Sequence, residues 1–263
     1  MAPTGSSLQR VSNVFAYIVM IVVNGIAGAT TLIGGRTTAD VSNAYPTPIT
    51  PAGYVFAIWG VIYVLLAAFV VYQALPRNKD RAFHERIGWL FVLSCALNII
   101  WIVLWQSLQL GLSVLVILLY LLALVAIYVR LDIGKVKVGR GERLTVHLPF
   151  SVYLGWLTIA TVADVAVTLT AANWDGFGLG LDIWMEVMFL VILVVAVAIA
   201  FLRRDIAYEL VIIWAFAGIA VNQGSNPGIF NLIIIGAILV ALATTVSVMW
   251  NRWFRPDGSS TRR

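Results

Sequence analysis

The chain has 263 residues, of which 61% are hydrophobic and only 11% are charged, and its mean hydropathy is +0.96. A soluble domain carries about 25% charged residues, so this composition excludes a water-soluble globular protein and makes lipid the main solvent. The net charge of +5 comes from basic residues in short loops between apolar runs, where they set membrane orientation, and it gives no reason to expect a nucleic acid partner.

Apolar runs of about 20 residues recur along the chain, and this length crosses the hydrocarbon core of a bilayer as an α-helix. We therefore predict an all-α integral membrane protein with about eight transmembrane helices. The predicted spans are 11–33, 51–75, 88–110, about 111–131, 144–170, 183–202, 206–221 and 229–250.

The loop charges support this number of helices. With eight spans, both tails and alternate loops lie on one side of the membrane, and that side carries all of the 17 Lys and Arg residues except Arg36. Basic loops stay in the cytoplasm, so we predict that both termini are cytoplasmic. We expect the protein in the plasma membrane of a bacterium or archaeon.

The segment that opens the second span carries aromatic residues at helical spacing. Phe56, Trp59 and Tyr63 follow the pattern i, i+3, i+7, which places three rings on one helix face. Such a stripe most often serves ordinary packing between helices. Here it lies within a membrane span and two other segments repeat it, so we interpret it as one wall of a ligand pocket.

The third span supplies a second wall, in which Asn98 and Trp101 lie on one helix face. Asn98 is a polar amide that needs hydrogen-bond partners, and an interhelical bond explains it as well as ligand contact does.

Asp164 is the ionisable residue that lies deep in a predicted span. A carboxylate there costs at least about 2.5–3.5 kcal/mol unless it is paired, solvated or protonated, so it should face the bundle interior. It would either contact a ligand or form an interhelical hydrogen bond to Asn24, Asn98 or a threonine. An α-helix rises 1.5 Å per residue, which places Trp59, Trp101 and Asp164 at similar depths below the outer ends of their spans. We therefore predict that the three residues meet and that the loop around Pro48 covers them.

Three motifs in these spans resemble a known family. Residues 51–59 with Tyr63 resemble the PPGWVF…W…LY start of the second helix in the TspO/MBR family of tryptophan-rich sensory proteins, which includes the mitochondrial translocator protein. Residues 97–101 resemble its LNxxW motif in helix three. Residues 148–150, with Trp156 and Ala160, resemble its PYxxW…fA motif in helix five. The order and spacing agree over about residues 11–170.

The resemblance implies a five-helix bundle over residues 11–172 that binds porphyrins or haem, other flat hydrophobic ligands, or sterols in some members, and that often forms a homodimer. Three additional helices would then occupy 183–250, with a cytoplasmic tail at 1–10 and a basic cytoplasmic tail at 251–263. No cofactor is required. Motif matches and the pocket argument together give these ligand-binding candidates: Tyr54, Trp59, Tyr63, Asn98, Trp101, Trp156, Ala160 and Asp164.

This sequence departs from the family pattern at three places. The second proline of the family motif is Ala52 here, the tryptophan of its GW pair is Tyr54, and the LN of its helix five appears as Ala163-Asp164. The natural ligand could therefore differ from that of the family.

Our leading hypothesis is a membrane ligand-binding protein, and the alternative is a multi-pass transporter that uses Asp164 as a coupling or substrate site. An enzymatic role, the oxidative breakdown of porphyrin reported for some family members, ranks last because no acid–base or nucleophile constellation is present. We predict no catalytic residues. With two histidines and one cysteine in the whole chain, we also predict no metal site.

Overall fold

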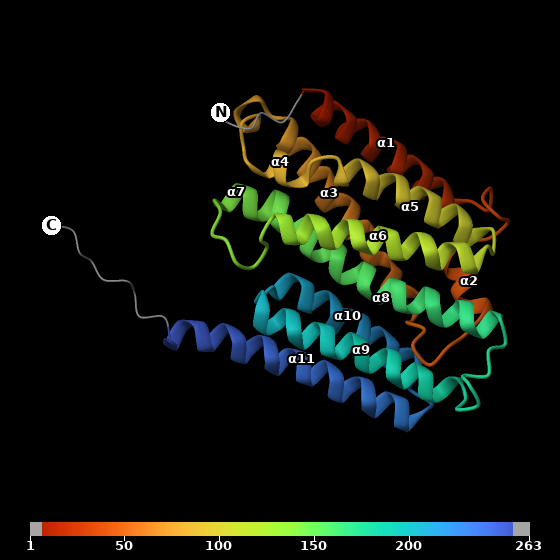
Figure 1. Cartoon of the computed structure of the whole chain (residues 1–263). Helices are drawn as coiled ribbons and strands as arrows, with labels where there is room; N and C mark the ends of the chain where they lie inside the picture. Colours follow the sequence, from red (N-terminus) through yellow and green to blue (C-terminus); the bar gives the residue numbers. More distant parts are fainter. Residues whose placement is uncertain (1–6, 255–263) are drawn as a thin grey trace.

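The computed structural model describes residues 7–254, apart from the side chains of 181–182 and 251–254. This part of the chain is helical and contains no β-strand (Figure 1). The long helices are α1 (Ser7–Ala29), α3 (Ile58–Ala74), α5 (Leu90–Gln106), α6 (Leu110–Arg130), α8 (Leu148–Ala171), α9 (Leu181–Leu202), α10 (Ile206–Asn222) and α11 (Pro227–Phe254). The short helices are α2 (Thr38–Ala44), α4 (Phe83–Ile87) and α7 (Arg140–Glu142), with 3-10 turns at Gly53–Ala57 and Pro76–Asn78 and a π turn at Arg143–His147.

Among the described residues, six helical segments are long and apolar enough to cross a membrane, which supports an all-α membrane protein. Two further long helices, α5 and α10, are apolar but have 17 residues each. At 1.5 Å per residue they are about 25 Å long, close to the thickness of the hydrocarbon core.

The long helices pack side by side in two groups (Figure 1). Helices α1, α3, α5, α6 and α8 form one bundle. Helix α10 packs against α8 of this bundle, and α9 and α11 pack against α10. One end of the molecule holds α4, α7, the start of α1 and the end of α11, and the other end holds α2.

Two segments differ from the sequence prediction. Residues 34–50, expected to be a loop, contain α2, which starts with a capping box: the Thr37 side chain accepts from the Asp40 backbone N–H, and the Asp40 carboxylate accepts from the Thr37 backbone N–H. The second span was expected to be helical from Pro51, but the α-helix begins at Ile58 because a 3-10 turn precedes it. Other boundaries shift by a few residues: α1 begins within the expected tail 1–10 and ends at Ala29.

Helix α10 holds the 3-10 turn in place. The backbone N–H of Ala52 donates to the backbone carbonyl of Gly218 at 3.0 Å, and Asn222 and Gln223 donate to the carbonyls of Thr50 and Thr47 at 3.0 and 3.1 Å. These contacts tie the segment before α3 to the last three helices.

Candidate functional site

Trp59 lies at the centre of a cluster of aromatic rings contributed by α3, α5 and α8. Its ring centroid is 5.8 Å from Tyr63, 5.9 Å from Trp101, 6.1 Å from Trp156 and 6.3 Å from Tyr153. Tyr63 stacks on Trp59 with 24° between the ring planes, whereas Tyr153 and Trp156 meet it edge to face. The sequence prediction that the second, third and fifth spans bring their aromatic residues together is confirmed.

Asp164 lies beside this cluster and is buried. Its Oδ2 accepts the indole N–H of Trp101 at 2.9 Å, and its Oδ1 accepts from the Ser113 hydroxyl at 2.9 Å. Thr168, one turn further along α8, lies at 3.5 Å. The expected meeting of Trp59, Trp101 and Asp164 is thus observed. The Asp164 side chain forms interhelical hydrogen bonds, but to Trp101 and Ser113 rather than to Asn24 or Asn98.

Asn98 joins four helices through a chain of hydrogen bonds. Its side-chain oxygen accepts from Asn24 at 2.6 Å, and its amide donates to the Tyr120 hydroxyl at 3.2 Å. The Tyr63 hydroxyl donates to Asn24 at 2.7 Å, which links the network to the ring stacked on Trp59. The Asn98 side chain is buried, and its partners Asn24 and Tyr120 belong to other helices. In this structure Asn98 therefore forms interhelical hydrogen bonds.

Two buried polar atoms in the cluster have no hydrogen-bond partner among the described residues. They are the Tyr153 hydroxyl oxygen and the Trp156 indole nitrogen. Both residues are at most 1% exposed, both rings touch Trp59, and they lie three residues apart on α8. Buried polar groups are normally hydrogen-bonded, so each unsatisfied group in a structure calls for an explanation. An ordered water or an acceptor oxygen of a bound ligand would satisfy each of them.

Two of the eight candidates contribute little to this cluster. The Tyr54 ring is 48% exposed and packs edge to face on Trp214 of α10, at 5.4 Å. Ala160 is half-buried and packs against the hydrophobic core without any specific contact. The structure brings together the other six, namely Trp59, Tyr63, Asn98, Trp101, Trp156 and Asp164.

The loop between α1 and α3 was expected to cover the pocket, and the structure anchors it at two places. At α2, the Thr38 carbonyl accepts from the Trp105 indole N–H at 3.2 Å, and the Thr38 hydroxyl lies 3.3 Å from the Gln106 amide. Further along, Thr47 is held by α10 as described above. The loop therefore lies at the end of the bundle nearest Trp101 and Trp105.

Sequence reasoning missed two relevant residues. Tyr153 lies on the same helix face as Trp156 and Asp164, but only the structure shows that its hydroxyl is unpartnered. Glu209, in the first turn of α10, is a second buried carboxylate, and both of its oxygens lack a partner among the described residues. The sequence did offer a signal for Glu209, because this ionisable residue lies three residues inside the predicted span 206–221.

The described residues contain no group of three or more His, Cys, Asp and Glu side chains that could hold a metal ion. Both histidines lie away from the cluster, His84 in α4 and His147 before α8, at the opposite end of the bundle from α2.

Comparison with curated proteins and with solved structures finds no match for this chain. A family model described as TSPO-like protein matches residues 10–250. The matched residues extend through α9 and α10 and along α11 as far as residue 250. It covers nearly the whole chain and agrees with the aromatic motifs in α3, α5 and α8, and the chain therefore belongs to the TSPO-like protein family.

Proposed function

We propose that the protein binds a flat hydrophobic ligand, such as a porphyrin or another tetrapyrrole, or a sterol-like lipid, within the aromatic cluster around Trp59. The observation that carries this proposal is the pair of unpartnered polar atoms, on Tyr153 and Trp156, inside a set of rings from three membrane helices. Rings offer stacking surface to a flat molecule, and the two donors offer hydrogen bonds to its carboxylate, carbonyl or hydroxyl oxygens.

The exposure of the rings indicates how such a ligand would enter. Trp101, Tyr153 and Trp156 are buried, whereas Trp59 and Tyr63 are half-buried. The rings contact one another directly, so a ligand must displace one of them. Trp59 is the ring that we expect to move, because it combines a central position with partial exposure.

Haem would bind differently from metal-free porphyrin only if the protein supplied a ligand to the iron. Both histidines are far from the cluster, so no histidine could serve as an axial ligand. We expect affinity to come from stacking and from the Tyr153 and Trp156 donors.

The decisive experiment titrates purified protein with protoporphyrin and follows the quenching of tryptophan fluorescence. We expect saturable quenching, a loss of affinity of at least tenfold in Trp101→Ala, and a smaller loss in Tyr153→Phe, which removes only the hydroxyl. Trp250→Phe is the matched control, because that exposed tryptophan lies near the end of α11. Equal affinity in the parent and in both cluster variants would place the ligand elsewhere.

The transporter alternative gains no support from the surroundings of Asp164. Both carboxylate oxygens are engaged by donors from α5 and α6, as expected of an anchor between helices. A coupling site would have to release these bonds in each cycle. Proton-driven uptake that is lost in Asp164→Asn but kept in Ser113→Ala would restore the transporter hypothesis.

We further propose that all eight long helices span the membrane, with both termini in the cytoplasm, and that the five-helix unit at 11–172 and the helices at 183–250 are its two parts. In support, α5 and α10 lie alongside the longer helices, and the basic loops gather at the end opposite α2. Single cysteines in a Cys95→Ala background test this arrangement. We expect Gly178→Cys to react with an impermeant maleimide added to intact cells, and Gly139→Cys to react only in inverted membrane vesicles.

We also propose a homodimer in a bacterial or archaeal plasma membrane, on the family resemblance. Light scattering of the protein–detergent complex measures its mass. A mass of one chain at all protein concentrations would refute the dimer.

A further inference from the structure

An apolar groove lies on the outer surface of the molecule between α9 and α11. It has a volume of about 740 Å³, within the range of small-molecule sites. The residues that line it are all apolar and come from 193–202 of α9 and 239–246 of α11. Ala243 is buried, whereas Phe201 and Leu242 are exposed. Small side chains thus form the floor of the groove and large ones its rims, which face the lipid.

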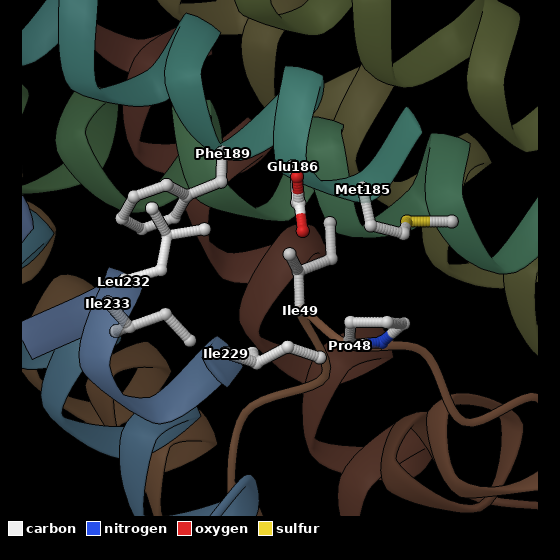
Figure 2. Close-up of a pocket in the computed structure, with 8 residues that line it drawn as sticks. All are labelled: Pro48, Ile49, Met185, Glu186, Phe189, Ile229, Leu232 and Ile233. Carbon is white, nitrogen blue, oxygen red and sulfur yellow. The ribbon is translucent and has the colours of Figure 1, made fainter. Parts of the chain in front are cut away.

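The two helices are closed against each other beyond the end of the groove that is nearer α2. Phe189 of α9 lies beside Leu232 and Ile233 of α11 (Figure 2) and packs on Phe216 of α10 at 4.8 Å. Gly236 lets α11 approach here, since a Cβ atom at this position would lie 2.4 Å from the Phe189 ring. The groove begins about one turn after this contact and runs toward the basic end of the bundle.

The length of the groove matches one leaflet of a bilayer. From Leu193 to Leu202, α9 rises about 14 Å, and half of the hydrocarbon core is about 15 Å thick. On α11, Trp250 lies one turn past the last groove residue, Val246, and is exposed. Exposed tryptophans at helix ends mark the membrane–water interface. The groove therefore extends from near the middle of the bilayer to its surface, which is the depth of one acyl chain.

A cationic side chain follows the point where the groove reaches this interface. Arg204 comes two residues after Leu202, the last groove residue of α9, and is half-buried. Its buried Nε has no hydrogen-bond partner among the described residues, and neither ion pair found there includes it. The neighbouring Arg203 is engaged, because it pairs with Asp132 at 3.8 Å and lies over the Tyr128 ring. Arg204 is thus the arginine that an external anion can use.

The loop between α6 and α7 adds positive charge at the same end of α9. A Cβ atom at Gly134 would lie 1.9 Å from the Arg203 carbonyl oxygen, so this loop lies directly against the end of the helix. The next residue, Lys135, is exposed and forms no ion pair in the described part of the chain. Guanidinium and ammonium groups bind phosphate, and basic residues at a membrane surface attract anionic lipids. The open end of the groove therefore favours an anionic headgroup.

We infer that the groove between α9 and α11 binds an anionic glycerophospholipid, such as phosphatidylglycerol, with one acyl chain between the two helices and its phosphate at Arg204. Phosphatidylcholine offers the same chain, but its choline brings a second positive charge to this basic end. The site shares no residue with the aromatic cluster, so the inference does not rest on the function proposed above.

The test uses native mass spectrometry of the purified full-length protein, titrated in detergent with phosphatidylglycerol or with phosphatidylcholine of the same acyl chains. We expect one phosphatidylglycerol to bind saturably and more tightly than phosphatidylcholine. Arg204→Gln should weaken this binding about fivefold, the effect of one basic residue at a membrane surface. Arg77→Gln is the matched control, because Arg77 is exposed in the turn before α4, across the bundle from α11.

Two leucine variants separate the groove from the rest of the lipid-facing surface. Leu242 and Leu115 are exposed to the same degree, 55% and 57%, but Leu242 lines the groove and Leu115 lies on α6. Leu242→Ala should weaken the binding of phosphatidylglycerol, and Leu115→Ala should leave it unchanged. Ala243→Trp should fill the groove and abolish the binding.

The headgroup alone distinguishes a lipid site from a plain phosphate site. Glycerol phosphate has the same phosphate without acyl chains, so it should fail to displace the lipid. The inference is overturned if glycerol phosphate competes as well as the lipid, or if phosphatidylglycerol binds no more tightly than phosphatidylcholine. It is also overturned if Arg204→Gln binds as tightly as the parent, or if Leu242→Ala behaves like Leu115→Ala.

Discussion

The indole N–H of Trp101 and the carboxylate of Asp164 form a 2.9 Å hydrogen bond that joins α5 to α8 at the edge of the aromatic cluster. The same Trp101 ring packs 5.9 Å from Trp59 and stacks on Trp105 at 6.2 Å. The carboxylate thus fixes the orientation of a ring in the proposed ligand site. In the proposed site Asp164 would be a positioning residue, because its effect on a ligand would pass through Trp101.

Removing the Asp164 carboxylate should destabilise the protein. In Asp164→Ala the Trp101 N–H loses its acceptor, whereas the Ser113 hydroxyl keeps the Leu110 carbonyl at 2.8 Å, and an unsatisfied buried polar group costs about 1–3 kcal/mol. Asp164→Asn retains one acceptor oxygen and should lose less. Thermal unfolding in detergent measures both, and unchanged stability in Asp164→Ala would show that the bond contributes nothing to the fold.

Gly218→Ala should weaken the contact between α10 and the turn before α3. A Cβ atom at this position would lie 1.9 Å from Val55 Cγ2, and overpacking costs about 1–3 kcal/mol. Gly60→Ala in α3 is the control: no other atom lies within 4 Å of the place that its methyl group would occupy, so alanine should stabilise the helix by about 0.5–1 kcal/mol.

The double variant Gly218→Ala with Val55→Ala tests the cause of that loss. Shortening Val55 removes the clashing methyl group, so the pair should be more stable than Gly218→Ala alone. A double variant with the sum of the two single losses would mean that the residues do not touch.

Two carboxylates near the start of α10 should respond to mutation in opposite directions. Both oxygens of Glu209 are buried without a partner among the described residues, so Glu209→Leu should raise the unfolding temperature. Asp205 accepts the Tyr128 hydroxyl at 2.9 Å and the backbone N–H groups of Ala207 and Tyr208, so Asp205→Ala should lower the stability by about 1–2 kcal/mol as a lost helix cap. A lower unfolding temperature in Glu209→Leu would reveal that this glutamate has a stabilising partner.

Stability should fall below neutral pH, partly because of His84 in α4. Burial lowers the pKa of this histidine below its ordinary value of 6.5, although the hydrogen bond from Nε2 to the Asn78 carbonyl opposes the shift. The unfolded chain then binds the proton more readily, so the contribution is fully present above about pH 6.5 and is lost as the pH falls towards the lower pKa of the folded state.

Unfolding temperatures between pH 5 and pH 7.5 check this expectation. The slope due to one histidine is at most about 1.4 kcal/mol per pH unit. His84→Gln keeps a donor near Asn78 but cannot titrate, and it should flatten the profile. An equally steep profile in this variant would assign the pH dependence to other groups.

Local sequence patterns predicted much of the site. Hydropathy located the long helices, and helical spacing with a rise of 1.5 Å per residue placed Trp59, Trp101 and Asp164 at one depth, where the structure has them in contact. These predictions succeed because the lipid restricts the chain to roughly parallel helices of known length.

The missed features depend on contacts between distant segments. Nothing in residues 34–57 indicates that α10 tightens the turn before α3, since the decisive bond joins the backbone of Ala52 to that of Gly218. Likewise, Asp164 was expected to bond Asn24, Asn98 or a threonine; Thr168 of its own helix lies at 3.5 Å, but the interhelical partners at 2.9 Å are Trp101 and Ser113, on helices that only the fold brings together.

The link between Ala52 and Gly218 uses main-chain atoms alone, so most side-chain substitutions at Ala52 would leave it intact. The last three helices are thus attached to the five-helix bundle in two ways, by the peptide chain at 172–180 and by non-covalent contacts that include this bridge, the Asn222 and Gln223 hydrogen bonds and the packing of α10 on α8. A protein cut within 172–180 and produced as two fragments should therefore reassemble, because the second attachment does not need chain continuity to define how the parts fit.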